Sequence, residues 1–162
     1  MEAQVRRAVA SDAPAVVAIH AEAIADRRST FETEAPTVNA VDDTIEAPDH
    51  LVLVAELDGE VVGWAAAAPY STRPVYAGVA ECSVYVTGAA RGQGIGWRLA
   101  EDLAEEAQQR GLHKLVGKLF PTNQASRRLV ERCGFRTVGL HVRHGQLDGS
   151  WRDVLLVERF LG

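Results

Sequence analysis

The stretch ARGQGIGWRLAEDLAEEAQQRG, residues 90–111, decides the fold because it joins a glycine-rich turn to an amphipathic helix. Apolar side chains recur every four residues along it, at Ile95, Leu99, Leu103 and Ala107. This spacing, with charged residues on the opposite side, predicts a helix over about 94–110 that buries one face. Gly111 lies where such a helix would normally end.

Three glycines crowd the start of this helix, although each costs about 0.5–1 kcal/mol relative to alanine in a helix interior. They are Gly92, Gly94 and Gly96. The first N–H groups of a helix have no backbone partner and lie at the positive end of its dipole. Glycines let an anion approach these groups closely, and Arg91 adds a positive charge beside them. The stretch therefore predicts a phosphate or diphosphate site; the alternative is an ordinary glycine-rich turn.

Periodicity and turn residues predict six elements before this stretch. They are a strand over 3–9, helices over 11–27 and 37–46, strands over 51–57 and 61–69, and a strand over 79–86. Ser11 is expected to cap the first helix, and Asp58-Gly59 to join the two middle strands as a hairpin turn.

Four elements are predicted after the stretch. They are a strand over 113–120, a helix between Asn123 and Gly134-Phe135, and strands over 136–147 and 151–160 that flank Asp148-Gly149. The resulting order, β-α-α-β-β-β-α-β-α-β-β, predicts a single α/β (α+β) domain over residues 1–162. Its mixed sheet should carry helices on its faces.

Composition narrows the class of protein. The 162 residues carry a net charge of −5, which disfavours a nucleic-acid scaffold or a basic membrane patch. The two cysteines, Cys82 and Cys133, provide neither a disulfide framework nor a CxxC metal motif. The N-terminal segment lacks the apolar core of a signal peptide, and no apolar run reaches about 18 residues. We therefore expect a cytoplasmic protein that binds no metal, nucleic acid or membrane.

The glycine loop differs from the common nucleotide motifs, because GxxxxGK[ST] is absent and GQGIG departs from GxGxxG. The pattern R-G-x-G-x-G after SVYV (83–86) instead resembles the acetyl-CoA loop of the GCN5-related N-acetyltransferases. NQASRRLVERCGF (123–135) is similar to the second cofactor segment of that superfamily.

Longer stretches resemble one group within the superfamily, the phosphinothricin acetyltransferases, and above all its arsinothricin N-acetyltransferase branch. They are STFETEAPT (29–37), PYSTRPVYAGVAECSVYV (69–86), KLVGKLFPTNQAS (114–126) and LDGSWRDVLLVER (147–159). The resemblance implies a mixed, mostly antiparallel seven-stranded sheet flanked by about four helices. It also implies a homodimer, built in part by the terminal strands.

The activity implied by the resemblance is acetyl transfer from acetyl-CoA to the α-amino group of a small acidic amino acid analogue. Substrates of the phosphinothricin, arsinothricin, and methionine sulfone or sulfoximine types are expected. Such a reaction detoxifies antibiotic amino acids and so confers resistance.

Glu81 is the carboxylate of the strand over 79–86, where alternation places it on one face with Val79, Ser83 and Tyr85. The resemblance implies that Glu81 is the general base, which removes a proton from the amine directly or through a water in a ternary complex. The alternative is a carboxylate that caps the sheet edge or pairs with an Arg.

The resemblance also implies the cofactor contacts. Backbone N–H groups of Val84, Tyr85 and Val86 are expected to meet the acetyl oxygen and the pantetheine arm, where this strand separates from its neighbour. The pyrophosphate is expected on the glycine loop, at Arg91, Gly92, Gln93, Gly94, Ile95 and Gly96. Asn123 and Ser126 are expected to touch pantetheine, although a purely structural helix cap explains them equally well.

The implied substrate carries a carboxylate and a second acidic group, so cations should line its site. Arg73 matches the family's anion-binding Arg, with Tyr76 as a hydroxyl donor and Phe31 as an apolar wall. A solvated loop Arg and two core aromatic residues are the alternatives. For Glu32 we expect an ion pair with an Arg rather than contact with a ligand.

The chain departs from the family at the proton donor for the leaving thiolate. Where the superfamily often has a Tyr and this group a His, the residue here is Val130, which has no proton to donate. Cys133, one turn along, is expected to be a small buried apolar residue, so we predict that water protonates the thiolate or that no dedicated acid does. Two other classes remain open: a non-catalytic acyl-CoA sensor, and an acetyltransferase of protein N-termini or polyamines.

Overall fold

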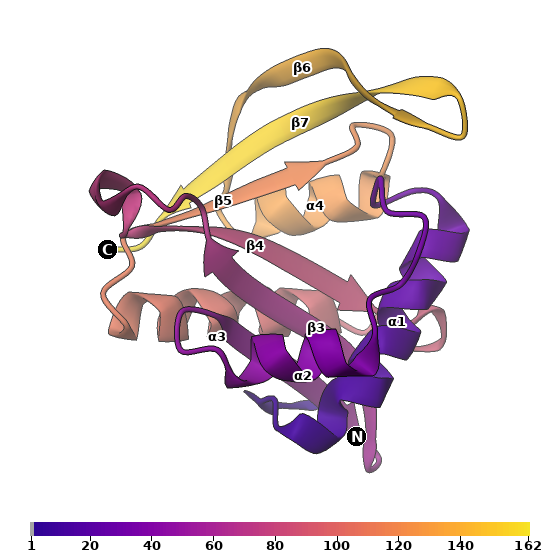
Figure 1. The fold of residues 1–162 in the computed structure, drawn as a ribbon, viewed down its shortest axis with the longest axis vertical. Helices are drawn as coiled ribbons and strands as arrows, with labels where there is room; N and C mark the ends of the chain where they lie inside the picture. Colours follow the sequence, from indigo (N-terminus) through magenta and orange to yellow (C-terminus); the bar gives the residue numbers. More distant parts are fainter. Residues whose placement is uncertain (1) are drawn as a thin grey trace.

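In a computed structural model, which describes residues 2–162, the elements follow the predicted order (Figure 1). The strands are β1 (Gln4–Arg7), β2 (Leu51–Leu57), β3 (Glu60–Pro69), β4 (Val79–Val86), β5 (Lys114–Leu119), β6 (Arg136–Leu147) and β7 (Ser150–Phe160). The helices are α1 (Ala13–Asp26), α2 (Val38–Glu46), α3 (Ile95–Gln109) and α4 (Gln124–Arg132). Short 3-10 turns lie between them, namely η1 (Ala10–Asp12), η2 (Pro74–Tyr76) and η3 (Gly88–Ala90).

The strands form one seven-stranded sheet in the order β1-β2-β3-β4-β5-β7-β6. Neighbouring strands are antiparallel except β4 and β5, which run parallel. Helices α1 and α2 cover one face, while α3 and α4 pack together on the other (Figure 1). The predicted mixed, mostly antiparallel sheet with four flanking helices is therefore confirmed. Within residues 2–162, no helix has the length and apolar character needed to span a membrane.

The start of α1 differs from the prediction, because Ser11 is not its cap. The helix begins at Ala13, and Asp12 occupies the N-cap position. The Asp12 carboxylate instead accepts a hydrogen bond from the Val9 N–H at 2.8 Å and pairs with Arg6 at 2.8 Å. These contacts draw the chain into the η1 turn, so β1 ends earlier and α1 begins later than the sequence pattern predicts.

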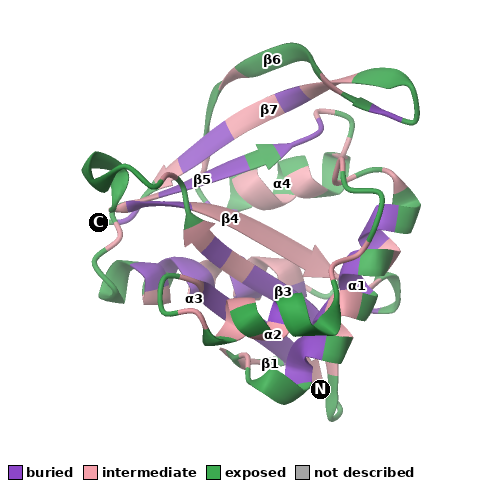
Figure 2. Cartoon of the chain, viewed as in Figure 1, coloured by how far each residue is buried: buried purple, intermediate pink, exposed green. Residues whose placement is uncertain are grey.

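The core has a layer on each side of the sheet. The predicted stripe of α3 is fully buried against β2, β3 and β4, and α1 and α2 bury Val16, Ile19 and Val41 against Val54 and Trp64. Figure 2 shows this burial along α3 and β3. Because both faces of the sheet are covered, β2 has a continuous apolar run over 51–55 instead of an alternating pattern.

The parallel strands β4 and β5 separate soon after they meet. Their pairing ends at Glu81 and Val116, after three residue pairs, whereas β4 stays paired with β3 as far as Val86. Figure 1 shows the two ribbons diverging from a common start, with α4 beside the opening. Beyond Glu81, backbone groups of β4 on the β5 side therefore have no ladder partner, and the predicted separation of this strand from its neighbour is confirmed.

Candidate active site

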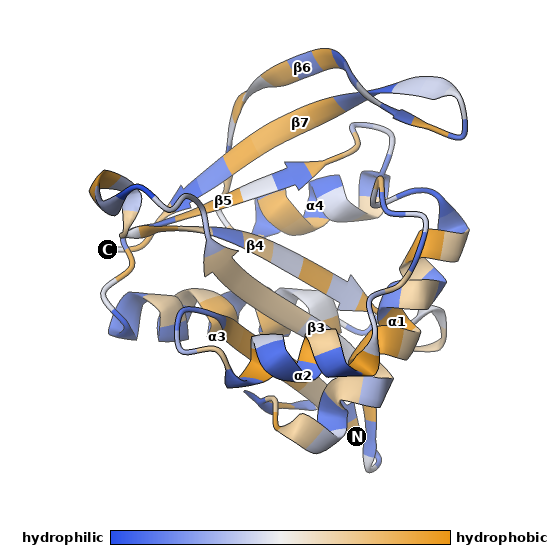
Figure 3. Ribbon diagram, in the orientation of Figure 1, coloured by the Kyte–Doolittle hydropathy of each residue, from blue (hydrophilic) through white to orange (hydrophobic). Residues whose placement is uncertain are grey.

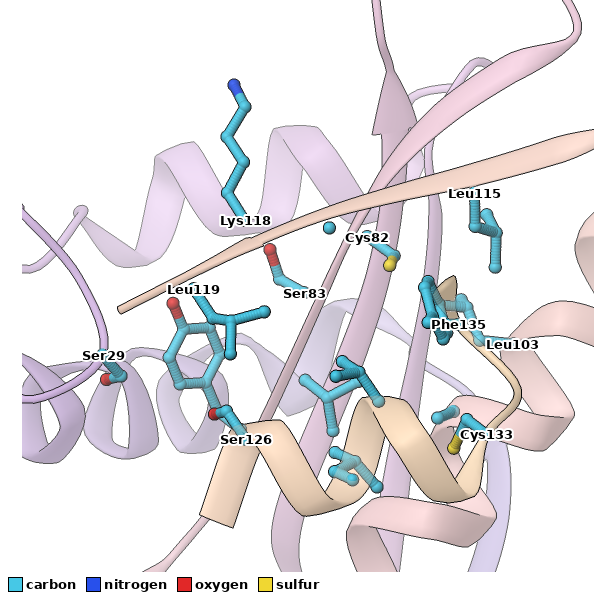
Figure 4. A pocket seen from close by; sticks show the side chains of 16 residues that line it. Ser29, Cys82, Ser83, Leu103, Leu115, Lys118, Leu119, Ser126, Cys133 and Phe135 are labelled. Carbon is cyan, nitrogen blue, oxygen red and sulfur yellow. The ribbon is translucent and has the colours of Figure 1, made fainter. Parts of the chain in front are cut away.

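The opening between β4 and β5 forms a cleft, here called the inner cleft (Figure 4). Its walls come from β4, β5, α3 and α4, and include Cys82, Ser83, Val84, Tyr85, Gly117, Lys118, Leu119, Ser126, Leu129, Val130 and Cys133. Most of these side chains are apolar, and the open edge of β4 supplies backbone donors and acceptors. The inner cleft therefore suits a slender, weakly polar arm that hydrogen-bonds to a strand edge.

A second, wider cleft, here called the outer cleft, adjoins the inner one and reaches the start of α3. The two share Ser29, Val84, Tyr85, Ser126 and Leu129 in their walls. The outer cleft also includes the glycine loop and the first residues of α3 and α4. Together the clefts form one path from the helix N-terminus to the strand opening.

Two of the three glycines hold the loop in a backbone conformation that other residues rarely adopt. Gly92 and Gly94 have φ values of 81° and 78°, and beyond the adjoining residues no atom of the described chain lies within 4 Å of the position that a Cβ would take at either. Gly94 is the N-cap of α3 and offers no side chain to its first N–H groups. Gly96 differs, since it packs beside Leu129 of α4. The loop thus presents bare backbone to the outer cleft, as an anion site requires.

The outer cleft is rich in positive charge although the chain as a whole is acidic. Its walls include Arg28, Arg91, Arg128 and Arg132, against the single carboxylate Asp26. Arg132 also lies over the Trp97 ring, 4.6 Å from its centroid. Sequence analysis identified only Arg91 among these cations. The four-residue spacing of Arg128 and Arg132 on a helix is the signal that places both on the cleft side of α4.

Two carboxylates of α1 hold the segment that precedes the glycine loop. Glu22 accepts hydrogen bonds from the Thr87 hydroxyl at 2.7 Å and the Gly88 N–H at 2.6 Å. These bonds lower the pKa of the Glu22 carboxyl below its usual value of 4.5. One turn later Asp26 pairs with Arg91 at 3.3 Å, and Arg91 also donates to the Val86 carbonyl at 3.2 Å. Helix α1 therefore fixes both ends of the segment over 87–91.

The second predicted cofactor segment opens α4. The Asn123 side chain accepts a hydrogen bond from the Ser126 N–H at 3.2 Å and caps the helix. Both residues also line the outer cleft, so the cap does not decide between their two predicted roles. Gln93, predicted with the glycine loop, is exposed and lies outside the walls of both clefts.

Glu81 lies at the last pair of the β4–β5 ladder, where the opening begins. Alternation along β4 is as predicted, since Tyr85 packs on His20 and Trp64 on the α1 side while Cys82 and Val84 pack toward α3. The Glu81 side chain is 40% exposed and pairs with Lys118 of β5 at 3.1 Å. The ion pair considered as an alternative is thus present, with Lys in place of Arg. A half-exposed pair of this kind leaves the carboxylate accessible to an amine.

Arg73 and Tyr76 lie together on the exposed η2 turn between β3 and β4. The Arg73 guanidinium is 5.6 Å from the centroid of the Tyr76 ring, and Tyr76 meets Tyr70 edge to face. The Tyr70 N–H donates to the Val79 carbonyl at 3.2 Å, which ties the turn to the start of β4. The turn is therefore close in the chain to Glu81, but neither Arg73 nor Tyr76 lines either cleft.

Phe31 belongs to an aromatic contact between the segment after α1 and the end of β5. Its ring meets Phe120 edge to face at 4.8 Å. The segment is anchored by Glu32, which pairs with His20 at 2.9 Å. The expectation of an Arg partner for Glu32 is therefore wrong, because its carboxylate pairs with the buried His20 of α1.

Val130, Cys133 and Cys82 all line the inner cleft, and Figure 4 labels the two cysteines. Burial raises the pKa of the Cys133 thiol to about 11 and that of Cys82 to about 12. Thiols with such pKa values stay protonated near neutral pH and are poor proton donors. Cys133 therefore fits the predicted small apolar residue. Within residues 2–162, no group of three His, Cys, Asp or Glu side chains is placed to hold a metal ion.

The site thus combines bare helix amides, arginines, an open strand edge and a carboxylate beside a lysine. The family model described as Acetyltransferase (GNAT) family matches residues 16–135. The L-methionine sulfoximine/L-methionine sulfone acetyltransferase of Pseudomonas aeruginosa is 33% identical over 162 residues, covering 98% of this chain and 94% of that protein. The phosphinothricin N-acetyltransferase of Streptomyces coelicolor is 31% identical over 164 residues, covering 98% of this chain and 96% of that protein.

Two solved structures have nearly the same fold. A ribosomal-protein-alanine N-acetyltransferase from Brucella melitensis superposes with a TM-score of 0.92 at 33% identity, covering 98% of this chain and 99% of that one. A phosphinothricin acetyltransferase from Sinorhizobium meliloti, solved in complex with acetyl-CoA, gives 0.93 at 29% identity, covering 100% and 90%. The family model spans most of the chain, and both relatives cover nearly all of it. The chain therefore belongs to the acetyltransferase (GNAT) family of enzymes.

Proposed function

We propose that this enzyme transfers the acetyl group of acetyl-CoA to the α-amino group of a small amino acid analogue with an acidic or tetrahedral side-chain end. Phosphinothricin, arsinothricin, and methionine sulfone or sulfoximine are the substrates to test, and acetylation would detoxify them. The observation that carries the proposal is the path from the bare N-terminus of α3 to the β4–β5 opening, which begins just beyond Glu81. Similarity to the two named acetyltransferases supports the substrate class.

Acetyl-CoA is the donor substrate, and the clefts fit its parts. The backbone of Gly92 and Gly94 with Arg91 would hold the pyrophosphate, because these groups combine free N–H donors and positive charge. The pantetheine arm would lie in the inner cleft along the open edge of β4. Backbone N–H groups of residues 84–86 would then face the acetyl oxygen as it gains negative charge.

Glu81 is proposed as the base. An α-ammonium group is protonated near neutral pH and has no lone pair to attack with, so Glu81 would take one proton from it. The amine nitrogen then bonds to the acetyl carbon, the carbon–sulfur bond breaks, and coenzyme A leaves as a thiolate. The nitrogen sheds a second proton as it becomes an amide. Since Val130 has no proton to donate, water is proposed to carry that proton to the thiolate. The transfer would be direct, within a ternary complex.

Arg73, Tyr76 and Phe31 are proposed to contact the acceptor. Arg73 and Tyr76 stay exposed on the η2 turn, where an anion can reach the guanidinium.

A homodimer through β6 and β7 and a cytoplasmic location complete the proposal. Apolar side chains stand exposed there, at Val138, Leu140, Val142 and Trp151, and Figure 3 shows hydrophobic stretches along the outer strand β6. Sedimentation of the intact chain measures this assembly directly.

Acetylation of protein N-termini is the second candidate, supported by the similarity to the ribosomal-protein-alanine N-acetyltransferase.

Coenzyme A release should be measured with phosphinothricin, arsinothricin, methionine sulfone, an alanine-initiated peptide and spermidine. We expect release with the amino acid analogues, and Arg73→Ala should raise their KM about tenfold or more, since a charged hydrogen bond is lost. Release with the peptide alone would establish the second candidate. Coenzyme A binding without release from any acceptor would indicate the sensor.

Glu22→Ala should raise the KM for acetyl-CoA by up to about 30-fold, because the segment over 87–91 loses two hydrogen bonds worth roughly 1 kcal/mol each. Initial rates against acetyl-CoA concentration measure the change. Glu46→Ala, which removes an exposed carboxylate from α2, is the control and should leave KM unchanged. An unchanged KM in Glu22→Ala would show that α1 does not position the loop.

The lowered pKa of Glu22 also sets the pH range in which its carboxylate stabilises the segment over 87–91. The carboxyl gains its hydrogen bonds as a carboxylate, so its folded pKa lies below the usual 4.5. The stabilisation is therefore fully present above pH 4.5 and is lost as the pH falls through the folded pKa.

A further inference from the structure

We propose that Lys118 is a specificity-determining residue that binds the α-carboxylate of the acceptor and so selects free amino acids over peptides and polyamines. This inference rests on the proposed function and deepens it, because it adds a contact that the sequence analysis did not predict. It starts from the ion pair between Lys118 and Glu81, in which the ammonium and carboxylate atoms lie 3.1 Å apart.

The two side chains come from neighbouring strands and share one face of the sheet. Glu81 of β4 is in register with Val116 of β5, and alternate residues of a strand share a face, so Lys118 lies on the Glu81 face. In Figure 4 the Lys118 side chain extends away from Cys133 and Phe135, which lie on the α4 side of the strands. Lys118 is therefore on the face of the sheet opposite α4, beside the opening.

Lys118 differs from the other lysine of β5. Lys114 is 26% exposed and pairs with a Glu158 side chain that is 9% exposed and also contacts Arg136. A network centred on a buried carboxylate in this way is structural. Lys118 is 54% exposed, and Glu81 is its one ion-pair partner among residues 2–162. An ammonium group has three N–H donors, so Lys118 retains donors for a further acceptor.

The pair is complementary to an α-amino acid. Standard bond lengths separate the ammonium nitrogen and a carboxylate oxygen of an amino acid by about 3 Å, which is close to the Glu81–Lys118 spacing of 3.1 Å. The substrate ammonium would meet Glu81 while its carboxylate meets Lys118, so that both charges are paired. Because Glu81 and Lys118 are each about half exposed, the substrate can approach without breaking their contact.

The Glu81–Lys118 pair would also disfavour two other kinds of acceptor, protein N-termini and polyamines. The N-terminal residue of a peptide has an amide in place of the α-carboxylate, and a polyamine has a second positive charge. An amide offers Lys118 only a neutral acceptor, and charge-assisted hydrogen bonds are roughly twice as strong as neutral ones. A second cation would be repelled by the ammonium. Lys118 therefore favours free amino acids.

The test compares methionine sulfone with its α-carboxamide. Wild-type enzyme is expected to prefer the acid about 10- to 100-fold in kcat/KM. Lys118→Met, which keeps the length and removes the charge, should abolish this preference, mainly by raising KM for the acid. Lys118→Arg should retain most of it. Because Lys118 also lines the inner cleft, the KM for acetyl-CoA is measured in both variants. The acid-over-amide ratio is unaffected by a change in that KM, since both acceptors use the same donor.

Lys114→Met is the matched control, because it removes a positive charge from the same strand about 13 Å away. It should keep the acid-over-amide preference. An unchanged preference in Lys118→Met, or an equal loss in Lys114→Met, would overturn the proposal. If wild-type enzyme acetylates neither compound, the proposed function fails. In that case, calorimetry measures the Kd of the acid and of the amide for the complex of the enzyme with coenzyme A. A preference for the acid that is lost in Lys118→Met and kept in Lys114→Met supports the role of Lys118, and any other pattern overturns it.

Discussion

Glu81→Gln should lower kcat for amino acid acetylation about 10²- to 10⁴-fold, the usual contribution of a positioned general base. Glutamine keeps the size and polarity of the side chain, but it cannot take a proton from the ammonium group. Binding of acetyl-CoA should be unchanged, since Glu81 lies outside the walls of both clefts. Coenzyme A release measured from pH 6 to pH 10 tests this, because an amine deprotonates without help at high pH. The variant should therefore recover part of its rate there.

Glu60→Gln is the control for this substitution. Glu60 is an exposed carboxylate at the far end of β3, so its loss should leave kcat within about twofold. Equal rates for wild type and Glu81→Gln at every pH would be incompatible with Glu81 as the base. The site would then rely on water or on another group to remove the proton.

Replacing both Gly92 and Gly94 by alanine should raise the Kd for acetyl-CoA about 10- to 100-fold. Each glycine has a left-handed φ, and each Cβ would project into open space at the mouth of the outer cleft. The methyl groups would occupy the space from which an anion reaches the helix amides. Backbone strain adds about 1–2 kcal/mol per substitution to the loss of folding stability. Calorimetry with acetyl-CoA, paired with thermal unfolding, measures both effects.

The same helix provides a matched control at its other end. Gly111 also has a left-handed φ, of 88°, and among residues 2–162 no atom beyond its chain neighbours lies within 4 Å of its Cβ position. Gly111→Ala should therefore cost similar stability per substitution, yet leave the Kd for acetyl-CoA unchanged. If Gly111→Ala raises the Kd for acetyl-CoA as much as the substitutions at Gly92 and Gly94 do, backbone strain alone explains the loss of binding. The glycine loop is then not the pyrophosphate site.

The order and type of the elements were predictable because their signals are local. The hairpin turns at Asp58-Gly59 and Asp148-Gly149 have positive φ at both residues. Asp-Gly pairs are strongly preferred in such turns. The four-residue stripe of α3 needs no information beyond its own sequence. The cap of α1 was predicted wrongly because Arg6 of the neighbouring strand competes for Asp12, and a local pattern does not include that partner.

The candidate site was predictable only in part. Sequence resemblance named Glu81 and the glycine loop, yet it did not include the cations Arg128 and Arg132 or the contacts of Glu22 with the segment after β4. Thr87 is 65 residues from Glu22, and no periodicity joins residues at that separation. The Lys118–Glu81 pair likewise depends on the register of two parallel strands joined by a whole helix.

The sequence by itself determined the elements, their order, the buried face of α3 and the bare backbone at Gly92 and Gly94, because these follow from helix period, turn geometry and glycine freedom within a few residues. Only the tertiary structure decided that β4 and β5 part after Glu81, which cations face the outer cleft, and that Lys118 lies beside Glu81. Those features depend on strand register and helix packing. Both are fixed by contacts between segments far apart in the chain, whose energies no local pattern contains.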